Sequence, residues 1–363
     1  MKRILKISVS VIVLALAGFV LNTLYSAGVF KTISPHLEGE LKTIYTNMPG
    51  TEDLEIDYEK RLLFISSTDR WKEWKGEKAD GGIYVLQLDS VNAVPRKLVT
   101  TYTGDFHPHG ISYFKQDSSN YLFVVNHNWG GNFVELFEYK NDTLFHQRSF
   151  SDELMNSPND VAAVAKDKFY VTNDHGYKKG ISRLAEEYLR LPYSNLVYFN
   201  GTSFIKAVDG LNYGNGVNIS NDGTLLYIAE STGRDLSTYE IDSKSGALEL
   251  IGNLDLKTGL DNIEVDSDGN LWIAAHPKLL SFVGHSKDPN KKSPSEVLKL
   301  IPAKDNKSYE VEQVYLDDGS QLSGSSIAVH YKNDLLIGVV FENKLLRAAL
   351  KKKPWTTFIA QGF

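Results

Sequence analysis

The sequence predicts an all-β protein, a six-bladed β-propeller that follows one hydrophobic N-terminal helix. From about residue 50 the chain consists of short apolar segments separated by turns, and long amphipathic helix patterns are scarce. One sequence template recurs six times in this region. An uncharged apolar stretch, Ile7 to Phe30, precedes the first copy. We therefore expect two parts: residues 1–31 as a signal-anchor or transmembrane segment, and residues 32–363 as one propeller domain.

The N-terminal stretch has the composition of a membrane span. Lys2, Arg3 and Lys6 precede it, and the next charge is Lys31. About 20 apolar residues are enough to cross a bilayer as a helix. The basic flank is expected to stay in the cytoplasm, which places the rest of the chain outside. Secretory signals have the same layout, and cleavage would release a secreted or periplasmic protein. Tyr25 is bulky where a cleavage site needs a small residue, which favours an uncleaved anchor.

The repeated template is a polar doublet, a short alternating strand, a turn and a second apolar strand. The six doublets are Glu52-Asp53, His109-Gly110, Asn159-Asp160, Asn215-Gly216, Asp261-Asn262 and Ser325-Ser326. They begin 46 to 64 residues apart, a spacing that fits four-stranded blades with loops. The turns Asp222-Gly223 and Asp268-Gly269 are strong hairpin signals. A β-sandwich, or two small β domains, would not explain why the doublet returns in register.

Composition excludes several classes of site. The chain has 363 residues and no cysteine, which excludes disulfides, zinc–thiolate sites, iron–sulfur clusters and a cysteine nucleophile. A ring of blades must therefore close by strand pairing alone. The net charge is −6, and without a basic cluster we expect no nucleic-acid binding. The run Ser323-Gly324-Ser325-Ser326 lacks the spacing of a Gly-x-Ser-x-Gly nucleophile elbow.

The chemistry of the doublets points to a cation. Equivalent innermost strands would bring all six to one ring at the mouth of the central channel. Carboxylate and amide oxygens dominate that ring. Calcium binds six to eight such oxygens, whereas zinc would prefer more imidazole or thiolate. Buried carboxylates without a cation would be costly. The alternative is that the doublets only cap the strand starts, as Asn and Asp often do at turns.

At these residues the chain resembles the paraoxonase/arylesterase family, a calcium-dependent group related to the gluconolactonase-like propellers. The resemblance covers about residues 45 to 350. It rests on Gly50-Thr51-Glu52-Asp53-Leu54-Glu55, Pro108-His109-Gly110-Ile111-Ser112, Val125-Asn126-His127, Asn159-Asp160, Thr172-Asn173-Asp174-His175, Asn215-Gly216-Val217-Asn218-Ile219-Ser220, Leu260-Asp261-Asn262-Ile263 and the tail from Gly324 to Phe341. It implies a hydrolase that cleaves lactones or aryl esters.

The resemblance also implies two calcium ions. A catalytic ion would be held by Glu52, Asn159, Asn215, Asp261 and Asn262. A deeper structural ion would be held by Asp53, Asp160 and the backbone carbonyl of Ile111. Each adjacent pair, Glu52/Asp53 and Asn159/Asp160, would divide between the two ions, because successive side chains of a strand point in opposite directions.

A histidine dyad is implied as well, with His109 as its first member and His127 as its second. Histidine can accept a proton from water near neutral pH, and a second histidine can assist the first. Asp174, His175 and His276 also end strands near the channel mouth, and we expect them to support the ligands or to touch substrate. Nearby, His107 is interpreted as loop structure. The segment from Ser67 to Gly82 is interpreted as a lid.

Three other interpretations remain open. A gluconolactonase-like enzyme would share the propeller and act on sugar lactones. A non-catalytic binding propeller would keep a stabilising calcium ring without needing the dyad. A propeller of the strictosidine-synthase type would lack calcium, and the oxygen-rich doublets argue against it.

Overall fold

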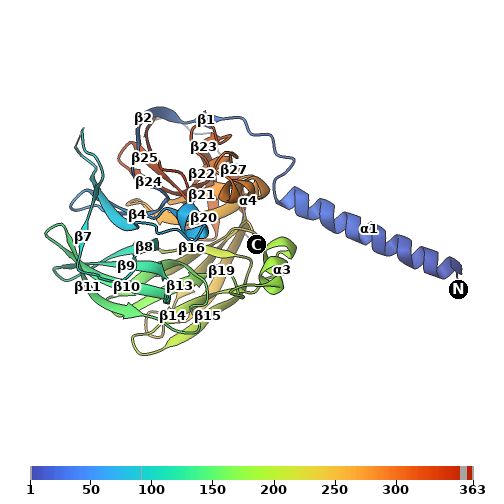
Figure 1. Ribbon diagram of the computed structural model, residues 1–363, viewed down its shortest axis with the longest axis horizontal. Helices are drawn as coiled ribbons and strands as arrows, with labels where there is room; N and C mark the ends of the chain where they lie inside the picture. Colours follow the sequence, from blue (N-terminus) through green and yellow to red (C-terminus); the bar gives the residue numbers. More distant parts are fainter. Residues whose placement is uncertain (1, 91, 352–357, 362–363) are drawn as a thin grey trace.

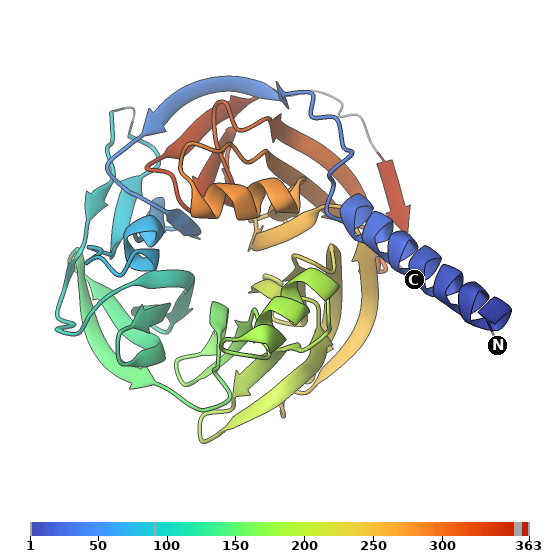
Figure 2. The ribbon, with the colours of Figure 1, turned by 45° about the vertical axis from the view of Figure 1, so that its right-hand side comes forward.

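The protein is a six-bladed β-propeller with one projecting N-terminal helix, as the sequence predicts. The computed structural model describes residues 2–90, 92–351 and 358–361. Figure 2 shows the blades arranged in a ring around a central channel. Each blade is built on four antiparallel strands, and in the first five blades these four strands run in chain order from the channel outward. The first strands of neighbouring blades therefore surround the channel side by side.

In each of the first three blades, the four main strands are consecutive in the chain. The first comprises β3 (Thr51–Asp57), β4 (Leu62–Ser67), β5 (Gly82–Gln87) and β6 (Arg96–Lys97). The second comprises β8 (Pro108–Gln116), β9 (Ser119–Asn128), β10 (Gly131–Lys140) and β11 (Thr143–Phe150), with β7 (Val99–Thr100) parallel at its outer edge. The third comprises β12 (Pro158–Ala165), β13 (Lys168–Asn173), β14 (Ser194–Phe199) and β15 (Phe204–Leu211).

The last three blades include the ring closure. The fourth comprises β16 (Gly214–Ile219), β17 (Leu225–Glu230), β18 (Asp235–Ile241) and β19 (Leu248–Asp255). The fifth comprises β20 (Gly259–Val265), β21 (Leu271–His276), β22 (Ser295–Pro302) and β23 (Ser308–Asp317), with β1 (His36–Leu37) and β27 (Phe358–Gln361) paired to β23. The sixth comprises β24 (Ser325–Tyr331), β25 (Asp334–Val339), β26 (Leu345–Leu350) and β2 (Gly39–Tyr45).

Strand pairing closes the ring. The N-terminal strand β2 lies antiparallel to β26 and so completes the last blade. This pairing ties the two ends of the propeller together without a covalent link. It also covers the edge that β26 would otherwise expose, which removes a site for unwanted strand pairing.

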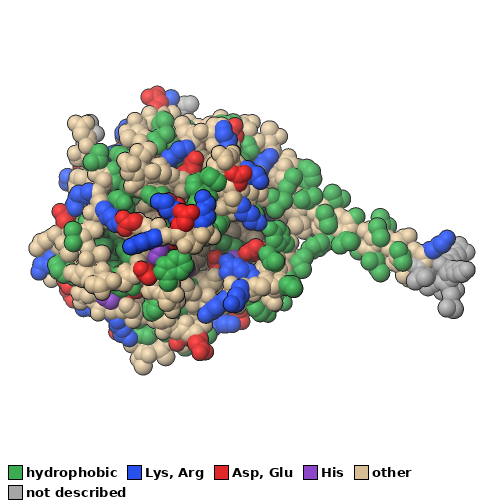
Figure 3. Space-filling model, viewed as in Figure 1, with side chains coloured by type: hydrophobic (Ala, Val, Ile, Leu, Met, Phe, Trp, Pro, Cys, Tyr) green, Lys and Arg blue, Asp and Glu red, His purple; other side chains and the backbone are tan. Residues whose placement is uncertain are grey.

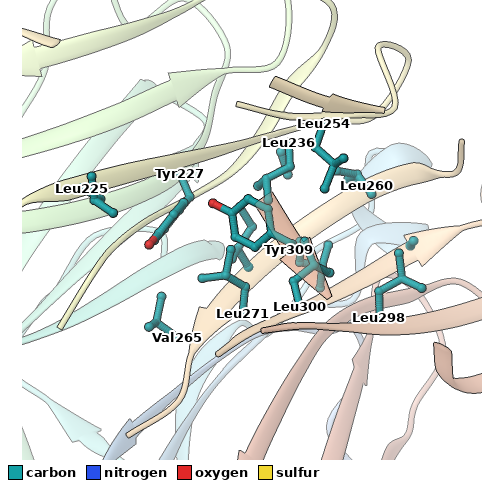
Figure 4. Packing of buried hydrophobic residues seen from close by; sticks show 14 residues of the cluster. Leu225, Tyr227, Leu236, Leu254, Leu260, Val265, Leu271, Leu298, Leu300 and Tyr309 are labelled. Carbon is teal, nitrogen blue, oxygen red and sulfur yellow. The ribbon is translucent and has the colours of Figure 1, made fainter. Parts of the chain in front are cut away.

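Apolar faces hold neighbouring blades together. Figure 4 shows the cluster between the fourth and fifth blades, to which β18 contributes Leu236, β20 contributes Leu260 and β22 contributes Leu300. All three side chains are fully buried. Burying one leucine stabilises the fold by about 1.5–3 kcal/mol. The second strand of a blade is enclosed on both faces, which explains why β4 is buried along its whole length.

The described residues also form four helices: α1 (Lys2–Ser26), α2 (Arg70–Trp74), α3 (Ile181–Leu189) and α4 (Leu279–Lys287). Figure 2 shows α2, α3 and α4 on one face of the ring, around the channel mouth. Figure 1 shows α1 projecting away from the propeller. Its residues Lys6–Ser26 are long and apolar enough to cross a membrane, and they are exposed up to residue 22, whereas Ser26 at the end of the helix is buried. The helices that cover the channel mouth thus share a side of the molecule with the attachment point of α1.

Candidate functional site

All six polar doublets lie where an innermost strand departs from regular pairing. The register shifts at Glu52 in β3, at His109-Gly110 in β8 and at Asn159-Asp160 in β12. It shifts in the same way at the doublets of β16, β20 and β24. Bulged residues do not follow the strict alternation of side chains, and they can re-aim a side chain. The alternation that we expected for Glu52/Asp53 and Asn159/Asp160 is therefore interrupted at the doublets themselves.

A cavity of about 880 Å³ lies over the channel mouth. Among the predicted site residues, its lining includes Glu52, His109, His127, Asn159, Asp174, Asn215, Asp261 and His276. The other predicted site residues, Asp53, Ile111, Asp160, His175 and Asn262, are not part of the lining. The structure thus brings most of the predicted set to one hollow and leaves the others behind its surface.

Glu52 of the first blade is the centre of contacts with the second, fifth and sixth blades. Its Oε1 lies 3.3 Å from Nε2 of His109. The same oxygen accepts hydrogen bonds from Asn262 Nδ2 at 2.9 Å and from Ser326 Oγ at 3.2 Å. Its Oε2 lies 3.8 Å from Nη2 of Arg70. Burial opposes ionisation, yet His109 and Arg70 together lower the pKa of Glu52 to about 2, so the carboxylate is charged at neutral pH.

Several oxygens of the ring are buried without a hydrogen-bond donor. They are Oε2 of Glu52 and Oδ1 of Asn159, Asn215 and Asn262. The amide nitrogen of Asn215 donates to Ser231 Oγ at 2.9 Å, and that of Asn262 donates to Glu52. These bonds assign the free side-chain atoms of Asn215 and Asn262 as oxygens. An unsatisfied buried acceptor costs about 1–3 kcal/mol, so four such atoms at one ring fit a cation.

The donor types decide which cation fits. Amide and carboxylate oxygens suit calcium. Among the described residues, no three His, Asp or Glu side chains form a metal-binding group by themselves. A cation at this ring would therefore depend on the asparagine oxygens, which is typical of calcium and not of zinc.

Asp53 and Asp160 form a second layer of buried carboxyl groups. Asp53 Oδ2 accepts from the amide of Ile111 at 2.6 Å, and Asp160 Oδ2 accepts from the amide of Val217 at 2.8 Å. Burial, followed by repulsion from Asp160, raises the pKa of Asp53 well above its ordinary value. Burial likewise raises the pKa of Asp160. A cation beside them would offset the cost of ionising both groups.

A glycine permits the close approach of this layer to the second blade. A Cβ atom on Gly110 would lie 2.4 Å from Oδ1 of Asp160, closer than any contact between real atoms of these types. The glycine of the His109-Gly110 doublet is thus needed so that β8 and β12 can meet at the carboxylates. This contact explains why glycine follows His109 in the doublet, which the sequence alone does not explain.

His276 supports a further member of the ring. Its Nε2 lies 2.8 Å from Oδ2 of Asp261, and its ring stacks on Phe282 of α4 with centroids 3.8 Å apart. Burial raises the pKa of Asp261, and His276 opposes that effect. The arrangement fixes the direction in which the Asp261 carboxyl group points.

The two predicted dyad histidines are neighbours. The ring centroids of His109 and His127 lie 5.1 Å apart, and the rings are nearly perpendicular at 84°. Nδ1 of His127 lies 3.0 Å from Oδ1 of Asn132, which can only accept, so the proton is assigned to Nδ1. Burial, and then repulsion from the His109 ring whenever it is protonated, lowers the pKa of His127 to about 4. The imidazole of His127 is therefore neutral at neutral pH.

Asp174 and His175 anchor a helix at the cavity. Nδ1 of His175 lies 2.7 Å from Asp174 Oδ1, and its Nε2 lies 3.0 Å from Glu187 Oε1 on α3. Burial lowers the pKa of His175, but the two carboxylates overcome this effect and raise it to about 9. Asp174 thus reaches the cavity, whereas His175 lies behind it and holds α3.

Sequence reasoning missed Arg70 and Glu73. Both lie on α2 within the segment 67–82 that we expected to act as a lid, and both line the cavity. Glu73 bonds to His107, which is loop structure as predicted and also lines the cavity. Trp71 donates to the carbonyl of Ser286 on α4 at 3.2 Å. In the sequence, Trp71 and Trp74 were the only signal that pointed to this short helix.

Comparisons with known proteins agree with this geometry. The profile of the Arylesterase family matches residues 44–348. Serum paraoxonase/arylesterase 1 of Homo sapiens is 36% identical over 309 residues, 82% of this chain and 85% of that protein. Serum paraoxonase/arylesterase 2 of Gallus gallus is 36% identical over 307 residues, with the same coverage of both chains.

Solved structures share the fold at much lower identity. A gluconolactonase from Xanthomonas campestris superposes with a TM-score of 0.52 at 14% identity, covering 88% of this chain and 96% of that one. A luciferin-regenerating enzyme superposes with a TM-score of 0.51 at 11% identity, covering 91% and 98%. At these identities the likeness concerns the propeller alone. The profile match and the identity to full-length relatives confirm the resemblance: the chain belongs to the paraoxonase/arylesterase family.

Proposed function

We propose that this protein is a calcium-dependent hydrolase that cleaves aryl esters, lactones or both. One observation carries the proposal: unpartnered carboxylate and amide oxygens meet at the floor of a cavity, beside two adjacent histidines. The relatives named serum paraoxonase/arylesterase support an ester hydrolase.

Two ions are proposed, in two layers. Glu52, Asn159, Asn215, Asp261 and Asn262 would hold the ion at the cavity floor. Asp53, Asp160 and the backbone carbonyl of Ile111 would hold the deeper one. Calcium bound at the floor would polarise the carbonyl of the substrate and stabilise the negative charge that develops on its oxygen.

The chain's own residues supply the proton transfer. His109 lies at the cavity and accepts a proton from the attacking water. His127 is neutral, with its proton on Nδ1, so its Nε2 is free to assist His109. Asn132 keeps His127 in this tautomer. General base catalysis by a positioned histidine typically contributes about 10²–10⁴-fold to a rate.

Supporting residues keep this arrangement in place. His276 orients Asp261 through its 2.8 Å contact. Asp174 and His175 fix α3 at the cavity wall, so that substrate meets a formed surface. Residues on α3 and α4, with Trp129, would contact the apolar part of a substrate.

We also propose that the protein is membrane-anchored outside the cytoplasm, with residues 1–31 as the anchor and 32–363 as the catalytic domain. The end of α1 and the residue that follows it belong to the cavity wall, since Ser26 and Ala27 line the cavity and the carbonyl of Ala27 accepts from the amide of Leu279. Figure 3 shows apolar side chains along α1 and a hollowed face beside it. The cavity would therefore open next to the bilayer. Cleavage of α1 would instead give a secreted or periplasmic enzyme.

The direct test is hydrolysis of phenyl acetate and of a medium-chain lactone by the full chain in detergent, with and without a calcium chelator. His109→Gln should lose activity about 10²-fold or more, and His36→Gln, at a half-buried histidine on β1 that does not line the cavity, is the matched control. Full activity after verified removal of calcium would refute the mechanism. Preference for gluconolactone would favour a sugar lactonase. Calcium binding without turnover of any ester or lactone would favour a binding propeller.

A further inference from the structure

Arg70 is a buried cation whose hydrogen bonds go to backbone. Its side chain is 5% exposed. Nη1 donates to the carbonyls of Gly50, Thr68 and Val340 at 3.3, 3.4 and 3.4 Å, and Nη2 donates to that of Pro108 at 3.4 Å. These carbonyls belong to the first, second and sixth blades or their flanking loops. A buried arginine normally pairs with a carboxylate at hydrogen-bond distance, so this arrangement requires an explanation.

The nearest carboxylate is Glu52, and the contact is electrostatic. Nη2 lies 3.8 Å from Oε2, beyond a hydrogen bond, and Oε2 has no donor. Asn262 and Ser326 already hold the other oxygen, Oε1. The orientation of Glu52 therefore does not depend on Arg70. What Arg70 adds is a positive charge that leaves Oε2 free for another cation.

Arg70 cannot turn this charge away from the site. It is the first residue of α2, which is capped by Asp69. Trp71 is tied to α4 and Glu73 to His107, on opposite sides of the helix. A Cβ on Gly50 would lie 2.7 Å from Nη1, so the guanidinium fills the space beside the first blade. The positive charge of Arg70 is thus held in a fixed place at the site by the contacts of α2.

We propose that Arg70 acts on the site through the charge of Glu52 and not through its orientation: the buried guanidinium competes with calcium for this carboxylate and so weakens calcium binding at the cavity floor. Two cations beside one buried carboxylate repel each other, and burial leaves that repulsion poorly screened. When calcium is absent, Arg70 compensates the charge of Glu52. This inference rests on the proposed function.

The test is calcium titration by calorimetry of the full-length wild type, Arg70→Gln and Arg70→Lys. Both variants lose the guanidinium fork, but only Arg70→Gln loses the charge. Arg70→Gln should bind calcium at the floor site about tenfold or more tightly than wild type, because a cation close to the ion has been removed. Arg70→Lys should stay within about threefold of wild type. A merely structural role would move both variants in the same direction, towards weaker binding.

The other possible results also support or refute the role of Arg70. If Arg70→Gln unfolds in a chelator but regains its circular dichroism spectrum at lower calcium than the wild type needs for saturation, the proposal holds. If it stays unfolded in millimolar calcium, or binds calcium no more tightly than wild type, the proposal is overturned. Absence of calcium binding by the wild type would instead refute the proposed function itself.

Discussion

Replacing Gly216 with alanine should disturb the cation ring directly. A Cβ on Gly216 would lie 2.6 Å from Asn262 Cα and 2.7 Å from the carbonyl oxygen of Asp261. Carbon atoms in good contact are about 3.5–4.0 Å apart. The inner strands β16 and β20 must therefore separate by about 1 Å at the position of two proposed ligands.

The magnitude follows from this displacement. Overpacking of a tight site costs about 1–3 kcal/mol, which lowers the melting temperature by several degrees, at about 2–4 °C per kcal/mol for a domain of 150–250 residues. Misplacement of active groups by about 1 Å can cost about 100-fold in rate. We expect Gly216→Ala to weaken calcium binding and to slow phenyl acetate hydrolysis. Both effects should be larger than the small fraction of unfolded protein in this variant can explain.

Gly252→Ala is the matched control. Gly252 lies in β19 of the same blade, and the nearest heavy atom to its added Cβ would be 3.7 Å away, an ordinary contact. The assays are calorimetric calcium titration, thermal melting and initial rates for both variants. Wild-type affinity and rate in Gly216→Ala would show that the contact between β16 and β20 does not govern the site.

Three other predictions concern pH, catalysis and ring closure. The pKa of His175 is raised to about 9, so the ion pairs of His175 with Asp174 and Glu187 contribute fully to stability below its unfolded pKa of about 6.5, and this contribution is lost as pH rises through 9. The variant His175→Gln should therefore show a smaller fall of melting temperature between pH 6.5 and pH 9 than the wild type. An unchanged slope would refute the raised pKa of His175. Because the pKa of His127 is about 4, an acidic limb of the rate profile near that pH should disappear in His127→Gln, and a limb that persists would exclude His127 as its source. Deleting residues 1–31 should leave a folded, soluble propeller, whereas deleting 1–46 removes β2 and exposes β26; equal melting temperatures for the two deletions would contradict closure by β2.

The sequence predicted the architecture because the propeller repeats itself. Each doublet and each turn such as Asp268-Gly269 is a local signal, and six copies in register outweigh the ambiguity of any one. The bulges escaped prediction since they depend on how an inner strand meets its neighbour. Gly216 illustrates this point, because only the next blade shows what a side chain there would strike.

The site was less accessible from sequence where contacts join distant residues. The oxygen donors could be proposed because they occupy equivalent positions in the repeat. The bonds from Asn262 and Ser326 to Glu52 join positions 210 and 274 residues apart, outside any local pattern. Arg70 belongs to no repeat, and its role follows only from the Glu52 carboxylate and the four carbonyls that surround it in space.

The most direct test of the account is the number of calcium ions that the purified chain binds, measured by equilibrium dialysis with metal analysis. We predict two ions for the wild type, one for Asn159→Ala, which removes an unpartnered oxygen at the cavity floor, and impaired binding at the deeper site for Asp160→Asn. Wild-type protein that binds no stoichiometric calcium, or an Asn159→Ala variant that binds both ions with unchanged affinity, would contradict the claim that these oxygens form the metal site.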